Sequence, residues 1–402
     1  QMETAVRAYI ADSTGNHVSS SGDISISAED TSVITATAVA ASVAGSFGAF
    51  GGSVSIGVAL AGNTIENVVE AYVSGAIIET TGTGDLTVQA TESATITATA
   101  QATAVSASIS LGFSLSGGGS ETESTILTTT KAYVDQSTLT LGGDLTVASS
   151  DTSTASAEVQ TTSVSLGLIA AAASGSVADA DASPTSQAHV SSSDVTASAI
   201  SIDATAQPQA ITEAQGLTVS TGVSVGVSEA TSSASPNVTA FIGGSGTQIT
   251  ADSLAVTANS QLPSSGESAC ADANGSSGGL LIGVDATTTS ATNDASVFSY
   301  VADGSTLSVS GATQITAMNA TRQVADADSQ GYGLVAAGAS VAHATATTTT
   351  KSWLGSNVDL DGDSLSITAV GSDDNYAETT AGAGGAIAGV GATADTTNDA
   401  TT

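Results

Sequence analysis

One tripeptide recurs seven times along the chain: a small residue, then an aromatic residue or histidine, then a branched or long aliphatic residue. Its central positions are separated by 63, 61, 56, 52, 59 and 53 residues. Self-similarity at a nearly fixed period is typical of repeat proteins, in which each unit contacts mainly its neighbours. We therefore expect one array over residues 1–402, with units at about 7–69, 70–130, 131–186, 187–238, 239–297, 298–350 and 351–402.

A second motif repeats with the same period and indicates strands. Its clearest copy is the Gly-Gly-Asp-Leu-Thr-Val segment at 142–147, with related copies at 84–88 and 22–26. Alternating apolar and hydroxyl residues favour β-structure, and a composition with 41% hydrophobic but only 3% aromatic residues favours a thin core. We predict an all-β, rod-shaped, repetitive β-solenoid that is parallel β-helix-like and built from seven units of about 52–63 residues.

The long alternating stretch in each unit changes its parity. In the second unit, apolar residues occupy even positions up to Ala104 and odd positions from Val105 onward, and the first and fourth units change in the same way. When the apolar alternation shifts by one residue, the apolar side chains move to the other face of the strand unless the backbone bends or bulges there. We therefore predict a corner near Ala104. Because a coil of a three-sided β-helix takes roughly 20 to 30 residues, we expect two or three coils in each unit.

The segment at 142–147 and its copies at 84–88 and 22–26 resemble the repeats of filamentous-haemagglutinin-type adhesins and other large repetitive bacterial surface proteins. The resemblance implies a secreted, extracellular stalk or fibre at the cell surface. The longer unit and the aromatic tripeptide depart from the short repeat of that family. The chain also begins at Gln1, and we interpret it as a piece of a longer protein.

The charge balance restricts the partners. The chain carries 38 acidic and 4 basic residues, a net charge of −34, which repels phosphate backbones and excludes nucleic acid as a partner. No apolar run is long enough to span a bilayer, so we expect no membrane insertion in this segment. Cys270 is the single cysteine, so the chain cannot form an internal disulfide.

The recurring aromatic position is the first candidate binding site. In a strand its two neighbours share one face, and they are small or aliphatic, whereas the residue two positions earlier is often polar. We therefore expect an outward stripe that binds a partner or only stabilises the array, formed by Tyr9, Tyr72, Tyr133, His189, Phe241, Tyr300 and Trp353. Three of the four basic residues lie two positions before it and are candidate interface charges: Arg7, Lys131 and Lys351.

Carboxylates form the second candidate site. Asp359, Asp361 and Asp363 alternate along the chain, and calcium prefers several oxygen ligands. The segment is not an EF-hand, because Ser364 occupies the sixth position and Val370 the twelfth. Either a calcium-stapled corner or a solvated acidic turn fits the pattern. Calcium is therefore the only candidate cofactor.

Catalytic candidates are weak, so we expect no enzyme. His189 belongs to the aromatic series, and no histidine lies near Cys270 in the sequence. We expect a non-catalytic structural or adhesive segment of an extracellular fibre, whose outer strand faces bind copies of itself or a cell-surface ligand. The alternative is a calcium-dependent carbohydrate- or surface-binding module. Alternating threonines such as Thr95, Thr97 and Thr99 leave ice binding as a lesser alternative.

Overall fold

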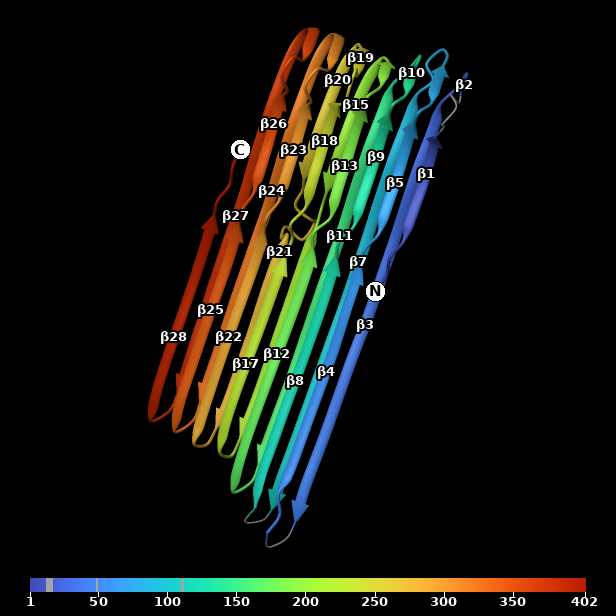
Figure 1. Ribbon diagram of the computed structural model, residues 1–402. Coiled ribbons are helices and arrows are strands. Elements are labelled where there is room, and N and C mark those ends of the chain that lie inside the picture. The colour runs from blue at the N-terminus through green and yellow to red at the C-terminus, as the bar shows by residue number, and fades with distance from the viewer. Residues whose placement is uncertain (12–16, 48–49, 110–111) are drawn as a thin grey trace.

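The computed structural model describes residues 1–11, 17–47, 50–109 and 112–402 (Figure 1). Within these residues the chain forms strands β1 to β28 and no helix, which confirms the all-β prediction. The first coil contains β1 (Ala5–Ala11), β2 (His17–Ser20), β3 (Ile24–Phe47) and β4 (Ser53–Ile65). The second repeats this order as β5 (Val68–Ser74), β6 (Ile77–Thr80), β7 (Leu86–Ile109) and β8 (Phe113–Ile126).

The five later coils follow the same path. In the fourth and fifth coils the long strand that corresponds to β3 and β7 is divided into two strands. Their strands are β9 (Thr129–Asp135), β10 (Thr138–Thr140), β11 (Leu145–Leu166), β12 (Ile169–Ala182); β13 (Thr185–Ser191), β14 (Asp194–Thr196), β15 (Ala199–Ala206), β16 (Gln209–Ser220), β17 (Val223–Ser233); β18 (Asn237–Gly243), β19 (Gln248–Ala251), β20 (Ser253–Ser260), β21 (Ala269–Gly279), β22 (Ile282–Asn293); β23 (Ser296–Val301), β24 (Thr306–Tyr332), β25 (Val335–Ala346); and β26 (Thr349–Leu354), β27 (Asp359–Gly384), β28 (Ile387–Asn398).

Equivalent strands of successive coils pair in parallel and build three sheets. The first strands of the coils form one sheet from β1 to β26, the return strands form another from β4 to β28, and the remaining strands form the third. Tyr9 lies opposite Tyr72, and Tyr72 lies opposite Tyr133, so the register advances by one whole sequence unit. The expectation of two or three coils per unit is therefore wrong: each unit is one coil, because its long strands take up most of its residues.

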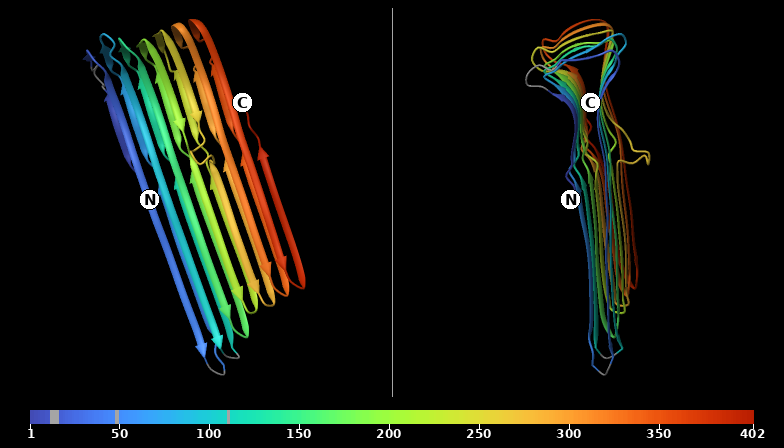
Figure 2. Two further views of the ribbon diagram at one scale, coloured as in Figure 1. Left: turned by 180° about the vertical axis from the view of Figure 1, so that it is seen from behind. Right: turned by 90° about the vertical axis from the view of Figure 1, so that its right-hand side faces the viewer.

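The coil has a wide end and a narrow end (Figure 2). We call the wide end the head: it contains β1, β2, the start of β3 and their counterparts. We call the rest the blade: there the remainder of β3 runs out and β4 runs back, again in every coil. A 24-residue strand such as β7 extends about 80 Å, whereas seven stacked strands span only about 30 Å. The solenoid is thus a flat plate over these seven coils, elongated along its strands.

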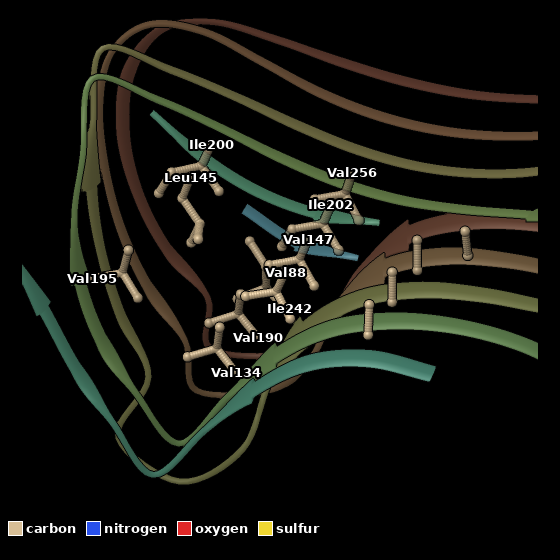
Figure 3. Close-up of a cluster of buried hydrophobic side chains, with 14 of the residues drawn as sticks. Val88, Val134, Leu145, Val147, Val190, Val195, Ile200, Ile202, Ile242 and Val256 are labelled. Carbon is tan, nitrogen blue, oxygen red and sulfur yellow. The ribbon is translucent and has the colours of Figure 1, made fainter. Parts of the chain in front are cut away.

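The head contains a core of large aliphatic side chains. Val134, Leu145, Val195 and Ile202 point into it from three sides of the coil (Figure 3), and each is fully buried. The alternation in the sequence explains their positions, because every wall of the head carries Val, Leu or Ile at inward positions. Burial of each such side chain contributes about 1.5–3 kcal/mol.

The blade interior is made of small residues and hydroxyls. Alanines such as Ala98 and Ala157 are fully buried between the two sheets, and farther out serines replace them. Ser106 Oγ lies 2.8 Å from Ser114 Oγ, and Ser116 Oγ lies 2.8 Å from Ser163 Oγ. Side chains of this size let the sheets approach closely, and these hydrogen bonds satisfy hydroxyls that the approach buries, whereas Ser232 Oγ and Ser277 Oγ are buried without a partner among the described residues.

The predicted corner near Ala104 is wrong. Strand β7 continues straight to Ile109, with Ala104 and Ser106 facing inward and Ile109 75% exposed. The first coil follows the same rule, since Val43 and Phe47 are each 81% exposed. The parity change marks the point where hydroxyl side chains take over the interior and aliphatic side chains move to the outside, so the backbone needs no bend.

Two spans of the coil keep a constant length. From Leu86 to Val105, as from Leu145 to Val164, there are 19 residues, and this holds in every coil except the fifth, which has 24. The return span, for example from Leu115 to Tyr133, is 18 residues between consecutive coils throughout. The remaining variation in unit length therefore lies in the head corner and in the hairpin at the blade tip. The two strand spans that the hairpin joins are 11 residues apart in the first coil, from Val43 to Val54, and 3 residues apart in the seventh, from Gly384 to Ile387.

Candidate functional site

The recurring aromatic residues form a continuous stack. Ring centroids lie 4.9 Å apart for Tyr9 and Tyr72, 4.8 Å for Tyr72 and Tyr133, and 4.3 Å for Tyr300 and Trp353, with the planes within 8° of parallel. These separations match the distance of about 4.8 Å between neighbouring strands, because the rings occupy one register position. Stacking thus adds a side-chain ladder to the backbone ladder of this sheet.

The stack lies on the outer face of its sheet. Its neighbours Ala71 and Val73 are fully buried in the head core, and Tyr72 projects from the opposite face. The two end members are the most accessible, with Tyr9 56% and Trp353 37% exposed. The interior members offer mainly ring edges to a partner. Binding through this stripe stays a prediction.

His189 acts as an uncharged ring within the stack. It lies between Tyr133 and Phe241, at centroid distances of 5.1 and 4.6 Å. Burial lowers the pKa of the His189 imidazole to about 4. The charge of Asp135 opposes this downward shift, and the charge of Lys131 adds to it. The imidazole is therefore neutral at pH 7 and is not a ready proton donor. Burial likewise raises the pKa of the Tyr133 hydroxyl to about 12.

The candidate interface charges do not form one cluster. Arg7 Nε lies 2.6 Å from Glu70 Oε2 in the next coil, and Lys131 occupies the following position of the same column. Arg7 is therefore paired within its own chain. Lys351 lies at the other end, on the seventh coil opposite Phe298. These positions indicate a role in strand register at least as much as in binding a neighbour.

The candidate calcium ligands lie on the outermost coil. Asp359, Asp361 and Asp363 are exposed at the start of β27, and Asp361 and Asp363 border an open groove of about 570 Å³ together with Asp252. Among the described residues, no three His, Cys, Asp or Glu side chains are arranged to hold a metal ion. The calcium corner therefore stays a prediction without a preformed site.

The sheet that contains the long strands carries an outer row of carboxylates that sequence analysis missed. Five acidic residues occupy one register position in coils three to seven: Glu158, Glu213, Asp272, Asp326 and Glu378. Like charges directly opposite one another are destabilising. Burial, Asp326 and Glu213 raise the pKa of Asp272 to about 6. Aligning the units on their aromatic residue would have revealed the row, since it follows that residue by 24 to 26 positions in four of the five coils.

A second carboxylate column lies inside, at the boundary between the two cores. Asp30, Glu92 and Asp151 occupy one register position, and Glu92 and Asp151 are at most 1% exposed. Asn67 Nδ2 donates to Asp30 Oδ2 at 2.8 Å and to Glu92 Oε1 at 3.4 Å. Thr128 donates to Asp151 Oδ2 at 2.7 Å.

Two carboxyls of this column, Glu92 and Asp151, have raised pKa values. Burial raises the pKa of Glu92 to about 8, and the neighbouring Asp30 and Asp151 reinforce the shift. Burial also raises the pKa of Asp151, although three hydroxyl donors oppose it. Asp285 is a third interior carboxyl, seated between Gly226 and Gly275, where a Cβ would collide with it. Burial raises its pKa to about 7.

The remaining reactive side chains do not form a catalytic group in the described part of the chain. Burial raises the pKa of the Cys270 thiol to about 12, and Glu267 and Asp272 reinforce the shift, so the nucleophilic thiolate is disfavoured. His17 Nε2 lies 3.2 Å from Glu79, and His343 Nδ1 lies 3.5 Å from Asp395, both on outer faces.

Comparison of the chain with models of protein families, with curated proteins and with solved structures found no match. The described residues also contain no helix long and apolar enough to cross a bilayer.

Proposed function

We propose that this chain is a non-catalytic structural or adhesive segment of an extracellular bacterial surface fibre, which associates through its outer strand faces. One observation carries the proposal: equivalent strands of seven coils pair in parallel register, and their two strand spans keep a fixed length except for an insertion in the fifth coil. A fixed span places each outward position above its counterpart, so that every coil extends the same surface by about 4.8 Å.

Mechanical continuity is the physical basis of this function. The parallel ladders run along the stacking axis, and the aromatic stack and the head core run beside them. Tension along that axis is shared among many backbone hydrogen bonds in each coil. The outer carboxylates attract cations and water, and they oppose nonspecific clumping.

Electron microscopy and sedimentation of the purified chain test this proposal. We expect ordered assemblies whose subunits keep the flat-plate outline, together with the circular dichroism of β-sheet. A particle that remains monomeric at every concentration and binds one small soluble ligand with fixed stoichiometry would contradict it.

Calcium-dependent surface binding is a second candidate, which the outer carboxylate row favours. Divalent cations would relieve the repulsion between neighbours such as Glu213 and Asp272. We expect calcium to raise the melting temperature by several degrees and Glu213→Gln with Asp272→Asn to reduce that rise. Asp359→Asn with Asp361→Asn is the matched pair that tests the sequence-predicted corner. If chelation leaves the melting temperature of the wild type unchanged, this candidate fails.

A further inference from the structure

The outer face of the return strands is apolar near the blade tip. Three consecutive outward positions are in register across β4, β8, β12, β17, β22, β25 and β28, and every one of them is Val, Leu, Ile, Ala or Gly. On β4 these residues are Val54, Ile56 and Val58, which are 49–65% exposed. We call this surface the apolar face.

The inner side of four of these strands carries buried serines, so their aliphatic residues do not face outward for lack of room inside. Ser55, Ser116, Ser176 and Ser224 alternate with the aliphatic residues and are buried between the sheets. A strand whose only requirement was burial would place its aliphatic residues inward and its hydroxyls toward water. Here the arrangement is reversed on β4, β8, β12 and β17, as it would be if a partner covered the outside.

Charge points to a second copy of this chain as that partner. In the blade of the first two coils, the sequence has no Asp, Glu, Lys, Arg or His over residues 31–65 and 93–120, in a protein with a net charge of −34. Glu121 and Glu123 follow only farther along β8, away from the blade tip. Two such molecules repel each other over most of their surfaces. The distal blade is where they approach with the fewest opposed carboxylates.

The dimensions of the face also suit a pair of copies. Seven strands about 4.8 Å apart and three outward positions per strand cover about 700 Å². Phe113 and Ile169, which are 54% and 67% exposed beside the face, enlarge it toward the roughly 800 Å² that a standard interface takes from each partner. Two flat sheets can pack at about 10 Å with such side chains between them.

A lipid surface fits the same face less well. In the described part of the chain, β4 pairs with β8 and otherwise makes only a bridge between Ile65 and Met2, and β28 pairs only with β25. Immersion in hydrocarbon would bury the unpaired backbone groups along both outer strands, at a cost of several kcal/mol for each group. Contact between two copies leaves those edges in water.

We propose that the apolar face is a contact between two copies of this chain, packed sheet against sheet. The proposal rests on the self-association included in the proposed function and names the surface responsible for it. The aromatic stripe then serves the stability of the head, and lateral pairing occurs at the opposite end of the coil.

Sedimentation velocity over a range of concentrations tests this pairing. Val225→Glu with Val227→Glu places two like charges on the apolar face, and both side chains are already more than 40% exposed. Val164→Glu with Val219→Glu is the matched control, because these valines are neighbours on the outer side of the other blade sheet. We expect a wild-type dimer at micromolar concentrations, at least about 100-fold weaker association in the first variant, and a change of less than about 3-fold in the control.

Each other outcome overturns the inference in a distinguishable way. If both variants retain wild-type association, copies meet on another surface, and the proposed function stands without this interface. If the wild type is monomeric but floats with phosphatidylcholine vesicles, and Val225→Glu with Val227→Glu abolishes flotation, the face binds lipid. If the wild type neither dimerises nor floats, the self-association in the proposed function fails as well. Circular dichroism of each variant verifies that the β-sheet is intact.

Discussion

The head and the blade share one strand register but fill their interiors with different chemistry. In the head, large aliphatic residues such as Leu145 and Ile202 point inward. In the distal blade, hydroxyls such as Ser116 and Ser163 point inward, and aliphatic residues such as Val225 point outward. Apolar burial therefore stabilises the head most, whereas the blade depends on backbone ladders, small-residue packing and paired hydroxyls.

Truncating a core residue of the head gives the largest expected effect. Leu145→Ala should lower the free energy of unfolding by about 2–5 kcal/mol, because it removes buried methyl groups and leaves a cavity. Leu166→Ala is the matched change in the blade of the same coil, where the side chain is 45% exposed, and it should cost less than about 1 kcal/mol. Guanidinium unfolding followed by circular dichroism measures both. Equal losses would remove the distinction between the two regions.

The boundary between the regions should respond to pH. Glu92 has a pKa raised from 4.5 to about 8, so between these values the folded state holds a proton that the unfolded state has lost. The free energy of unfolding must then fall as pH rises through this window, and Glu92→Gln should flatten the curve and stabilise the protein at pH 8 by on the order of 2 kcal/mol.

Thermal and chemical unfolding between pH 5 and 8 measures this dependence. Glu121→Gln, on the outer face of β8, is the control for loss of one negative charge. Parallel curves for wild type and Glu92→Gln would show that Glu92 is ionised in the folded protein.

The smallest expected effect concerns the blade hydroxyls. Ser116 and Ser163 form a 2.8 Å hydrogen bond between the sheets, and replacing either one alone leaves a buried hydroxyl with fewer partners, at a cost of about 1–2 kcal/mol. Replacing both by alanine should cost less than the sum of the single changes. A double-mutant cycle measures the coupling, and strict additivity would indicate that the hydroxyls act independently.

The head was the more predictable region, because its large inward residues alternate in a simple way. The same rule, that aliphatic residues face the core, gave the wrong corner at Ala104, since it assigned Val105 and Ile109 to the interior. The reversal depends on hydroxyl partners such as Ser114, supplied by another strand of the coil, and no local pattern reveals them. The number of coils per unit was unpredictable for a related reason, since the period alone does not say how far a strand runs before it turns.

The candidate sites divide in the same manner. Strand parity was enough to suggest an outer position for Tyr72 and its counterparts, and the structure places them there. The interior position of Glu92 and Asp151 had no such signal, because isolated carboxylates in a sequence this acidic are expected at the surface. Only the stacking of coils brings them together.

Because the 19- and 18-residue spans recur, successive units place their strands at the same register positions. A duplication or deletion of one whole unit in the gene would keep inward and outward residues on their proper sides, because every junction presents the same two lengths to the next. Additions within a unit are tolerated where the spans end, and also in the fifth coil, whose extra residues around 261–268 leave the plate as a loop (Figure 2). Copy number can therefore set the length of such a protein without a change of strand register, and the head corner and blade tip are where the length of a unit already varies.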